Sequence, residues 1–329
     1  TTEIYTLSLH DALPIFSERR IREHRNRAGY RIGDDKRIDL LRYAAWLMWL
    51  HHNPKPKRHA QDPPMESMQT LSSYDAIKEA ARARNAELSA SGRDIGQMPA
   101  VVNPARKAKA ETDFRFFCEA YFGQTFNLPW SDDHLTVIAR IETAVLHGGL
   151  FAMAMPRGSG KSSLAEVAGI WAMLIGAREF VCLIGSDAGH ARNMLESIKV
   201  ELETNELLLE DYPEAVFPIH ALERIHNRAK GQLYQGKPTR ITWTADEIVL
   251  PTIPDSKASG AIIRVAGIES RIRGMKFKRA DGRAVRPSLV ILDDPQTDES
   301  ARSDLQTRAR METLNGAILN LAGPGQKIS

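Results

Sequence analysis

Residues 154–163, AMPRGSGKSS, have the composition of a loop that binds phosphate through its backbone. Glycines let N–H groups approach phosphate oxygens closely, and the N-terminus of a following helix adds further N–H groups. At this spacing Lys161 reaches the β- and γ-phosphates of ATP, and the Ser162 hydroxyl is a ligand of Mg²⁺. The residues that we expect to bind the nucleotide are Pro156, Arg157, Gly158, Ser159, Gly160, Lys161, Ser162 and Ser163.

The Gly-Lys-Ser triplet is a weak signal by itself, because it occurs by chance in about one chain in ten of this length. Here a compact apolar run at 149–155 predicts a strand that enters the loop, and the residues from Lys161 onward predict a helix that leaves it. Met155 stands where the usual pattern has its first glycine. The flanking elements and a distant pair of carboxylates favour a nucleotide site over coincidence.

The distant pair is Asp293 and Asp294 in LVILDDP, residues 289–295. Four apolar residues predict a central strand that delivers both carboxylates to the carboxyl edge of the sheet, where the phosphate loop opens. Asp293 is then expected to hold Mg²⁺ through water, and Asp294 to orient or deprotonate the attacking water. The alternative is that the pair caps a helix or binds a structural cation.

Apolar runs that alternate with helical patterns predict an α/β fold with a mainly parallel central sheet flanked by helices. The strands are expected at 180–186, 260–267 and 288–294, and the helices at 113–123, 132–148, 161–177 and 188–209. Residues 239–253 predict an antiparallel hairpin, either inserted or at an edge of the sheet. The order leaves room for an extra strand between the loop strand and the acidic strand, which is typical of motor-type (RecA/ASCE-like) P-loop ATPases.

Composition indicates a globular chain without a membrane segment. The 329 residues are 43% hydrophobic and 26% charged, enough for one large core or for a core and a smaller unit. The most apolar stretch, 40–50, is about half the ~20 residues that a membrane helix needs. Cys118 and Cys182 lack metal-ligand spacing and His51 and His52 lack partners, so we expect reduced core thiols and no zinc site.

The net charge is only +3, but the positive charge is clustered. Residues 17–60 contain 12 Lys and Arg against 5 Asp and Glu, and residues 264–287 contain 8 against 2. Such clusters are typical of surfaces that bind phosphate backbones, and they also occur on plain solvated faces.

Composition divides the chain into four segments. Residues 1–16 resemble a translated sequencing adapter, so we expect a leader that is not native. Residues 17–52 predict a small basic helical segment with Trp46 and Trp49 on an apolar helix face. Residues 53–111 combine a proline-rich linker with an exposed helix, and residues 112–329 contain the predicted P-loop ATPase domain.

From about residue 113 onward the chain resembles the large terminase subunit of tailed bacteriophages, the motor that pumps DNA into the capsid. In that family the phosphate loop tends to lack its first glycine and to carry an arginine near its start, as PRGSGKS does with Arg157. WSDDHLTVIARI is similar to the family's segment upstream of the nucleotide site, and ELETNELLLEDYPEA to the helix after its second strand. GIESRIRGMKFKRADGRAVRPSLVILDDPQTDESARS is similar to its basic turn and acidic strand.

The resemblance implies a Mg²⁺-dependent ATPase that translocates double-stranded DNA. The implied catalytic residues are Arg157, Lys161 and Asp294, and the implied metal-binding residues are Ser162 and Asp293. The implied partners are double-stranded DNA, the phage portal protein and the small terminase subunit. The implied setting is a homo-oligomeric ring in the host cytoplasm, transiently at the procapsid portal, with no membrane contact.

The chain departs from the family pattern in two ways. Many members place Glu after the metal-binding Asp, whereas Asp294 is one methylene shorter, so Glu299 is a second candidate for the residue that activates water. The family also continues with a further strand and an RNase H-like nuclease domain. AGPGQKIS falls where that strand begins, so we expect a truncated ATPase portion without nuclease activity.

Other assignments stay open. Arg271, Arg273 and Lys276 either contact DNA phosphates or sense nucleotide, or they belong to a solvated loop. Trp130 and His134 either line the adenine pocket or pack at a helix start. Two other functions compete with DNA packaging: a helicase-like or remodelling ATPase, and a nucleotide-gated DNA-binding module without productive hydrolysis.

Overall fold

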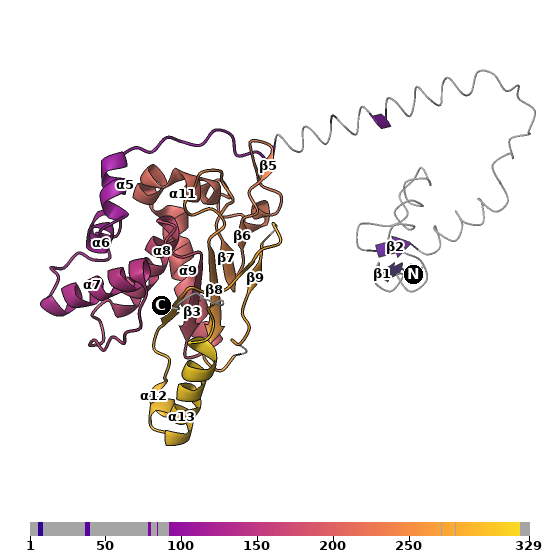
Figure 1. The fold of residues 1–329 in the computed structure, drawn as a ribbon. Coiled ribbons are helices and arrows are strands. Elements are labelled where there is room, and N and C mark those ends of the chain that lie inside the picture. The colour runs from indigo at the N-terminus through magenta and orange to yellow at the C-terminus, as the bar shows by residue number, and fades with distance from the viewer. Residues whose placement is uncertain are drawn as a thin grey trace, which may run out of the picture. The chain divides into compact units, whose positions relative to one another are not determined.

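The computed structural model describes residues 6–8, 37–39, 78–79, 84, 92–270, 272–279 and 281–322 (Figure 1). Contacts divide the chain into two units, residues 1–77 and residues 78–329. In the first unit, β1 (Thr6–Ser8) pairs antiparallel with β2 (Arg37–Asp39), with Leu7 opposite Ile38. Residues 37–39 lie within the helical segment predicted over 17–52 but form a strand, because their polar-apolar-polar alternation has the period of a strand.

Several predictions for the N-terminal third fall outside the described residues. Trp46 and Trp49 lie there, and so do His51 and His52. Of the exposed helix predicted within 53–111, the described residues Lys78, Glu79 and Arg84 are helical and exposed.

The second unit is a mixed α/β structure built on a five-stranded sheet. Its helices are α5 (Pro104–Ala110), α6 (Phe114–Tyr121), α7 (Asp132–His147), α8 (Lys161–Leu174), α9 (Ala188–Thr204), α10 (Glu206–Asp211), α11 (Pro213–His220), α12 (Asp298–Ala301), α13 (Asp304–Thr313) and the single turns η1 (His226–Ala229) and η2 (Leu314–Ile318). The strands of the sheet are β3 (Phe180–Gly185), β6 (Thr242–Trp243), β7 (Glu247–Val249), β8 (Ile262–Gly267) and β11 (Leu289–Leu292). Among the described residues of this unit, two short antiparallel pairs lie outside it, β4 (Leu233–Tyr234) with β5 (Lys237–Pro238) and β9 (Phe277–Lys278) with β10 (Ala284–Val285).

The strand order in the sheet is β11-β3-β8-β7-β6. β11, β3 and β8 run parallel, whereas β7 is antiparallel to β8 and β6 is antiparallel to β7. The sheet is thus mixed rather than mainly parallel. The predicted hairpin forms its far edge, which is one of the two places expected for it.

Both faces of the sheet are covered. Val181 and Leu183 of β3 belong to the main core, which also contains the apolar faces of α8 and α9. Cys182 and Ile184 point to the opposite face and join a second core with Ile318 of η2. This period-two alternation, apolar on both sides, is what a strand buried between two layers requires.

The two cysteines agree with the expectation from composition. Cys118 and Cys182 are free and fully buried, as predicted for core thiols. Within the described part of the chain, no helix has both the length and the apolar character to cross a lipid bilayer.

The segment before the phosphate loop differs from the prediction. Residues 149–155 form no strand, and Leu150 and Phe151 in it are exposed. β11, predicted as a central strand, stands at the end of the described sheet and pairs there with β3. An apolar run forms a strand only where a neighbouring strand makes hydrogen bonds with its N–H and C=O groups. Among the described residues, no strand pairs with 149–155. The expected order, with an extra strand between the loop strand and the acidic strand, is therefore not found in the described sheet.

The helix predicted over 188–209 is interrupted at Asn205. Its backbone is extended (φ −80°, ψ 101°), and its side chain accepts a hydrogen bond from the N–H of Leu208. Asn205 therefore ends α9 and caps α10, a role for which a short amide side chain is favoured over continuation of the helix.

Asp211 joins α10 to α5 and α6. Its fully buried carboxylate accepts hydrogen bonds from Arg106 Nε (2.5 Å), the Tyr121 hydroxyl (2.6 Å) and the N–H of Asn103 (3.1 Å). Burial acts to raise the pKa of Asp211, but the hydrogen bonds from Arg106 and Tyr121 outweigh it and hold the pKa below its ordinary value. The charged carboxylate therefore stabilises the folded state.

We expect Asp211→Asn to lower the free energy of unfolding by about 3 kcal/mol at neutral pH, because Arg106 loses its buried counter-charge. Since the native pKa is depressed, the contribution of Asp211 is present above about pH 4 and is lost as the pH falls below it. Urea unfolding at neutral and acidic pH measures both effects. Glu210→Gln removes a partly exposed partner of the same Arg106 and should cost less than about 1 kcal/mol. Equal losses from the two variants would contradict this account.

Candidate functional site

Two glycines shape the phosphate loop. Gly158 and Gly160 have positive φ angles of 80° and 77°, which side chains other than glycine rarely adopt. The turn is closed by a hydrogen bond from the N–H of Ser159 to the carbonyl of Pro156 (3.3 Å). Gly160 then serves as the N-cap of α8, so that Lys161 and Ser162 occupy its first turn. The loop and the helix start therefore form the combination that the spacing predicts.

The acidic pair lies directly against this helix start. The N–H of Asp293 donates to the carbonyl of Ile184 (3.0 Å), so that β11 stays in register with β3 to its last residue. The Ser162 hydroxyl donates to Asp293 Oδ2 over 2.7 Å, and the Lys161 ammonium forms an ion pair with Asp294. Asp293 is only 3% exposed. The structure thus brings together Lys161, Ser162, Asp293 and Asp294, four of the residues to which the sequence gives chemistry.

Asp294 has an unusual backbone. Its φ of 40° lies in the left-handed region, where a non-glycine residue carries strain of about 1 kcal/mol and Asp and Asn are the best tolerated. The side chain is exposed toward the loop, and the hydrogen bond from Lys161 holds the pKa of Asp294 below its ordinary value. Asp294 is therefore a charged carboxylate whose counter-ion is the lysine expected to bind phosphate.

The donor set fits a magnesium triphosphate. The Ser159 Oγ is buried and, among the described residues, has no hydrogen-bond partner, which marks an unfilled polar position inside the loop. Ser162 Oγ and Asp293 supply hard oxygen ligands, which Mg²⁺ prefers, and Mg²⁺ usually takes only one or two ligands from the protein beside phosphates and waters. The described residues contain no group of three or more His, Cys, Asp or Glu that would hold a metal by themselves.

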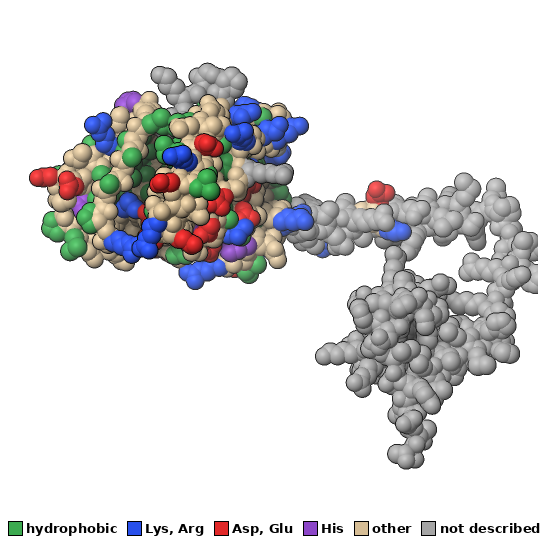
Figure 2. All heavy atoms as spheres, turned by 90° about the horizontal axis from the view of Figure 1, so that it is seen from below, with side chains coloured by type: hydrophobic (Ala, Val, Ile, Leu, Met, Phe, Trp, Pro, Cys, Tyr) green, Lys and Arg blue, Asp and Glu red, His purple; other side chains and the backbone are tan. Residues whose placement is uncertain are grey.

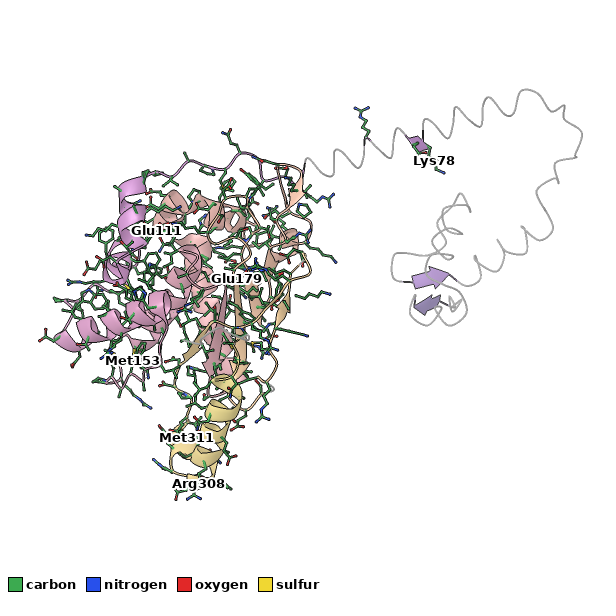
Figure 3. All side chains as sticks on the ribbon, viewed as in Figure 1. Lys78, Glu111, Met153, Glu179, Arg308 and Met311 are labelled. Carbon is green, nitrogen blue, oxygen red and sulfur yellow. The ribbon has the colours of Figure 1, made fainter. Side chains whose placement is uncertain are left out.

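The segment 149–155 separates two hollows beside the loop. One, the β11 groove, has a volume of about 630 Å³ and lies between 149–153 and the residues 289–295 of β11 and its end. The other, the α7 cavity, has a volume of about 610 Å³ and lies between α7 and 151–156. Met153, labelled in Figure 3, lines both. Lys161 and the two aspartates open into the β11 groove.

His134 and Trp130 have different roles. Trp130 stacks against Phe126 with ring centroids 5.1 Å apart and donates its indole N–H to Glu119, so it packs at the start of α7. His134 lines the α7 cavity, and its Nε2 lies 2.9 Å from the carbonyl oxygen of Ser159. Because a carbonyl only accepts, Nε2 of His134 is the donor, and the imidazole fixes the phosphate loop to α7.

Arg157 and Glu299 lie near α12. The Arg157 side chain is 96% exposed, and its Nη2 lies 3.7 Å from Asp298 Oδ1 at the first turn of α12. Glu299, the second candidate for water activation, is the next residue on that exposed turn. In the described structure neither of these side chains forms a hydrogen bond or ion pair with Asp293, Ser162 or Lys161.

The predicted basic turn is only partly free of acidic partners. Arg273 and Lys276 are exposed, and Arg271 lies outside the described residues. Other cations of the cluster are paired: Arg279 and Arg283 both contact Glu179 at 2.7 Å. On the face shown in Figure 2, basic and acidic side chains are interspersed rather than gathered into one basic surface. The described part of this turn thus offers three exposed cations without an acidic partner, Arg273, Lys276 and Lys278.

Two residues near the site carry no signal in the sequence. His190, in the first turn of α9, places its Nε2 3.4 Å from Asp293 Oδ2. Glu166, one turn along α8 from Ser162, has its pKa raised to about 7 by burial, with Asp293 and Glu201 adding to the effect and a hydrogen bond from Ser197 opposing it. Neither residue has neighbours at a motif spacing, so only the tertiary structure reveals their position.

Comparisons of the chain with models of protein families, with curated proteins and with solved structures gave no match.

The raised pKa of Glu166 predicts that stability falls as the pH rises from about 4.5 to about 7, because the folded state binds this proton more tightly than the unfolded chain does. Allowing for its partial exposure, we expect a loss of about 1–2 kcal/mol in the free energy of unfolding. Urea unfolding at about pH 5 and about pH 8 measures it.

Glu166→Gln should remove this part of the pH dependence. Glu312→Gln, on an exposed face of α13, is the matched control and should keep the wild-type slope. Identical slopes in the wild type and Glu166→Gln would show that burial does not hold the proton on Glu166.

Proposed function

We propose that this chain is the ATPase portion of a DNA-packaging motor, which hydrolyses ATP with Mg²⁺ and uses the cycle to translocate double-stranded DNA. The observation that carries the ATPase proposal is the contact between Ser162 and Asp293, with the ion pair of Lys161 and Asp294 beside it. A helix-start hydroxyl against a strand-end carboxylate is the arrangement in which P-loop enzymes share one Mg²⁺ between protein and nucleotide.

The chain's own residues divide the work of hydrolysis. Ser162 and Asp293 would hold Mg²⁺, which when bound neutralises charge on the phosphate oxygens. Lys161 and the exposed Arg157 donate to the β- and γ-phosphate oxygens as charge develops there. Asp294 accepts the proton of the water that attacks the γ-phosphorus in line, and ADP and phosphate leave.

The position of Asp294 favours it over Glu299 as the residue that activates water. Asp294 contacts Lys161 directly, whereas Glu299 lies on the exposed turn of α12. Lys161 lowers the pKa of Asp294 in the nucleotide-free site. When the lysine turns to phosphate, this stabilisation of the charged form ends, and the carboxylate becomes a stronger base.

The translocation part of the proposal rests on the terminase resemblance. It would make double-stranded DNA the substrate, the portal protein and a small terminase subunit the partners, and a homo-oligomeric ring at the procapsid portal in the host cytoplasm the working assembly. A motor that accepts every sequence must grip the DNA backbone rather than the bases. The exposed cations Arg273 and Lys276 have the chemistry for this contact.

The ATPase proposal predicts separate effects for two substitutions. Lys161→Ala should weaken binding of a fluorescent ATP analogue by tenfold or more, because it removes the charge on the phosphates. Asp294→Asn should bind within about threefold of the wild type but release phosphate about 10²–10³-fold more slowly, since Asn tolerates the left-handed backbone but accepts no proton.

Lys237→Ala, an exposed lysine of β5, is the control and should match the wild type in both assays. Wild-type hydrolysis by Asp294→Asn would contradict the assignment of Asp294. ATP binding by the wild type without any phosphate release, alone or with DNA, would instead favour the nucleotide-gated DNA-binding module.

The DNA proposal predicts a salt effect. Replacing Arg273 and Lys276 together by Ala should weaken binding of duplex DNA equally for unrelated sequences, and should reduce the slope of log affinity against log salt by about 2. Fluorescence anisotropy at several salt concentrations measures the slope, with Lys237→Ala, which removes one exposed charge elsewhere, as the control. An unchanged slope would place the DNA elsewhere, and ATP-driven unwinding of a forked duplex would favour a helicase.

A further inference from the structure

Helix α9 approaches the carboxyl edge of the sheet unusually closely. A Cβ atom added to Gly185, the last residue of β3, would lie 2.7 Å from Cδ2 of His190. One added to Gly267, the last residue of β8, would lie 2.8 Å from the backbone nitrogen of Ala188. Real Cβ atoms do not approach other atoms so closely, so both strands must end in glycine for α9 to begin where it does.

This close approach directs His190 toward the acidic edge. The backbone N–H of His190 donates to Asp187 Oδ1 (2.9 Å), the N-cap of α9, which fixes the first turn of the helix. The imidazole then lies against Gly185, with its Nε2 3.4 Å from Asp293 Oδ2. The same carboxylate oxygen accepts the Ser162 hydroxyl at 2.7 Å. One oxygen of Asp293 is therefore contacted from α8 and from α9.

We propose that His190 is a positioning residue, which holds the Asp293 carboxylate in the orientation needed to share Mg²⁺ with Ser162. The inference rests on the proposed function. It adds to it a residue outside the phosphate loop and the acidic strand, on a helix to which the sequence assigns only a structural role.

The contact between His190 and Asp293 would keep the Asp293 carboxylate oriented. Asp293 is nearly fully buried, so water cannot replace a lost partner, and rotation about its last side-chain bond is soft. Ser162 would hold Mg²⁺ through a lone pair of the same oxygen that donates its hydrogen to Asp293, so its position would serve two ligands at once. The contact from His190 comes from a different helix and would keep Oδ2 in place independently of Ser162. Residues that orient metal-binding side chains typically change metal affinity by 10–100-fold when they are removed.

The geometry fixes which imidazole nitrogen carries the proton. A carboxylate accepts hydrogen bonds and donates none, so Nε2 of His190 must bear the hydrogen. Long-range nitrogen–proton NMR correlations on the nucleotide-free protein report the protonated nitrogen, and the His190→Gln spectrum identifies the signal by its loss. We expect a proton on Nε2, and a changed chemical shift in Asp293→Asn. A histidine whose Nε2 bears no proton would overturn the proposal, whether or not the chain hydrolyses ATP.

The second measurement is Mg²⁺ affinity in the presence of ADP, by calorimetry. His190→Ala should weaken Mg²⁺ binding by about tenfold or more, and His190→Gln, which retains an N–H donor, should restore most of it. Affinity for ADP without Mg²⁺ should stay within about twofold in both variants. His147→Ala, an exposed histidine at the end of α7, is the control and should match the wild type.

The outcomes separate the two proposals. If wild-type protein binds neither ADP nor Mg²⁺, the proposed function fails, and the NMR measurement alone then decides the position of the His190 proton. If the wild type binds both and His190→Ala has unchanged Mg²⁺ affinity, the proposed function stands and the positioning role of His190 is refuted. Loss of affinity in His190→Ala without recovery in His190→Gln would also refute it, because a donated hydrogen bond would then not be the cause.

Discussion

The hydrogen bond between Ser162 and Asp293 is the contact on which the arrangement of this unit depends. It joins two residues 131 positions apart, one at the start of α8 and one at the end of β11. For the two to meet, β11 must end level with β3, and α8 must begin at the same edge of the sheet. The ladder from Leu289 to Leu292 and the hydrogen bond from Asp293 to Ile184 ensure the first condition, and Gly160 at the N-cap ensures the second.

Small residues at this edge supply the space that the contact requires. Gly185 and Gly267 let α9 begin directly above two strand ends, and Gly158 and Gly160 let the loop turn with positive φ angles. At Gly185 and Gly267 a side chain would collide with a nearby atom, whereas at Gly158 and Gly160 the positive φ angle disfavours one. Asp294 is the exception, since it keeps a charged side chain at a positive φ and so carries strain next to the loop.

The sequence predicted the parts of the site that depend on local pattern. The loop, the start of α8, the strands β3, β8 and β11 and the hairpin all follow from spacing within a few residues. The segment 149–155 was predicted as a strand from its apolar residues, but pairing depends on a neighbour that no local pattern reveals. The roles of His190 and Glu166 were missed for the same reason, because each becomes significant only when α8, α9 and β11 are packed together.

The site has a fixed half and an exchangeable half. Asp293 is buried, and its carboxylate is contacted by Ser162 of α8 and His190 of α9. A movement of the carboxylate would break both contacts and leave a buried charge without partners. Asp294 and Lys161 are 61% and 26% exposed, and an ion pair of this kind contributes at most about 1 kcal/mol. A polyphosphate that offers Lys161 several charged oxygens in place of one carboxylate can therefore displace Asp294 at small cost. In the proposed function the lysine would then turn to the nucleotide while Asp293 stays in place, so that nucleotide binding would release the proposed base.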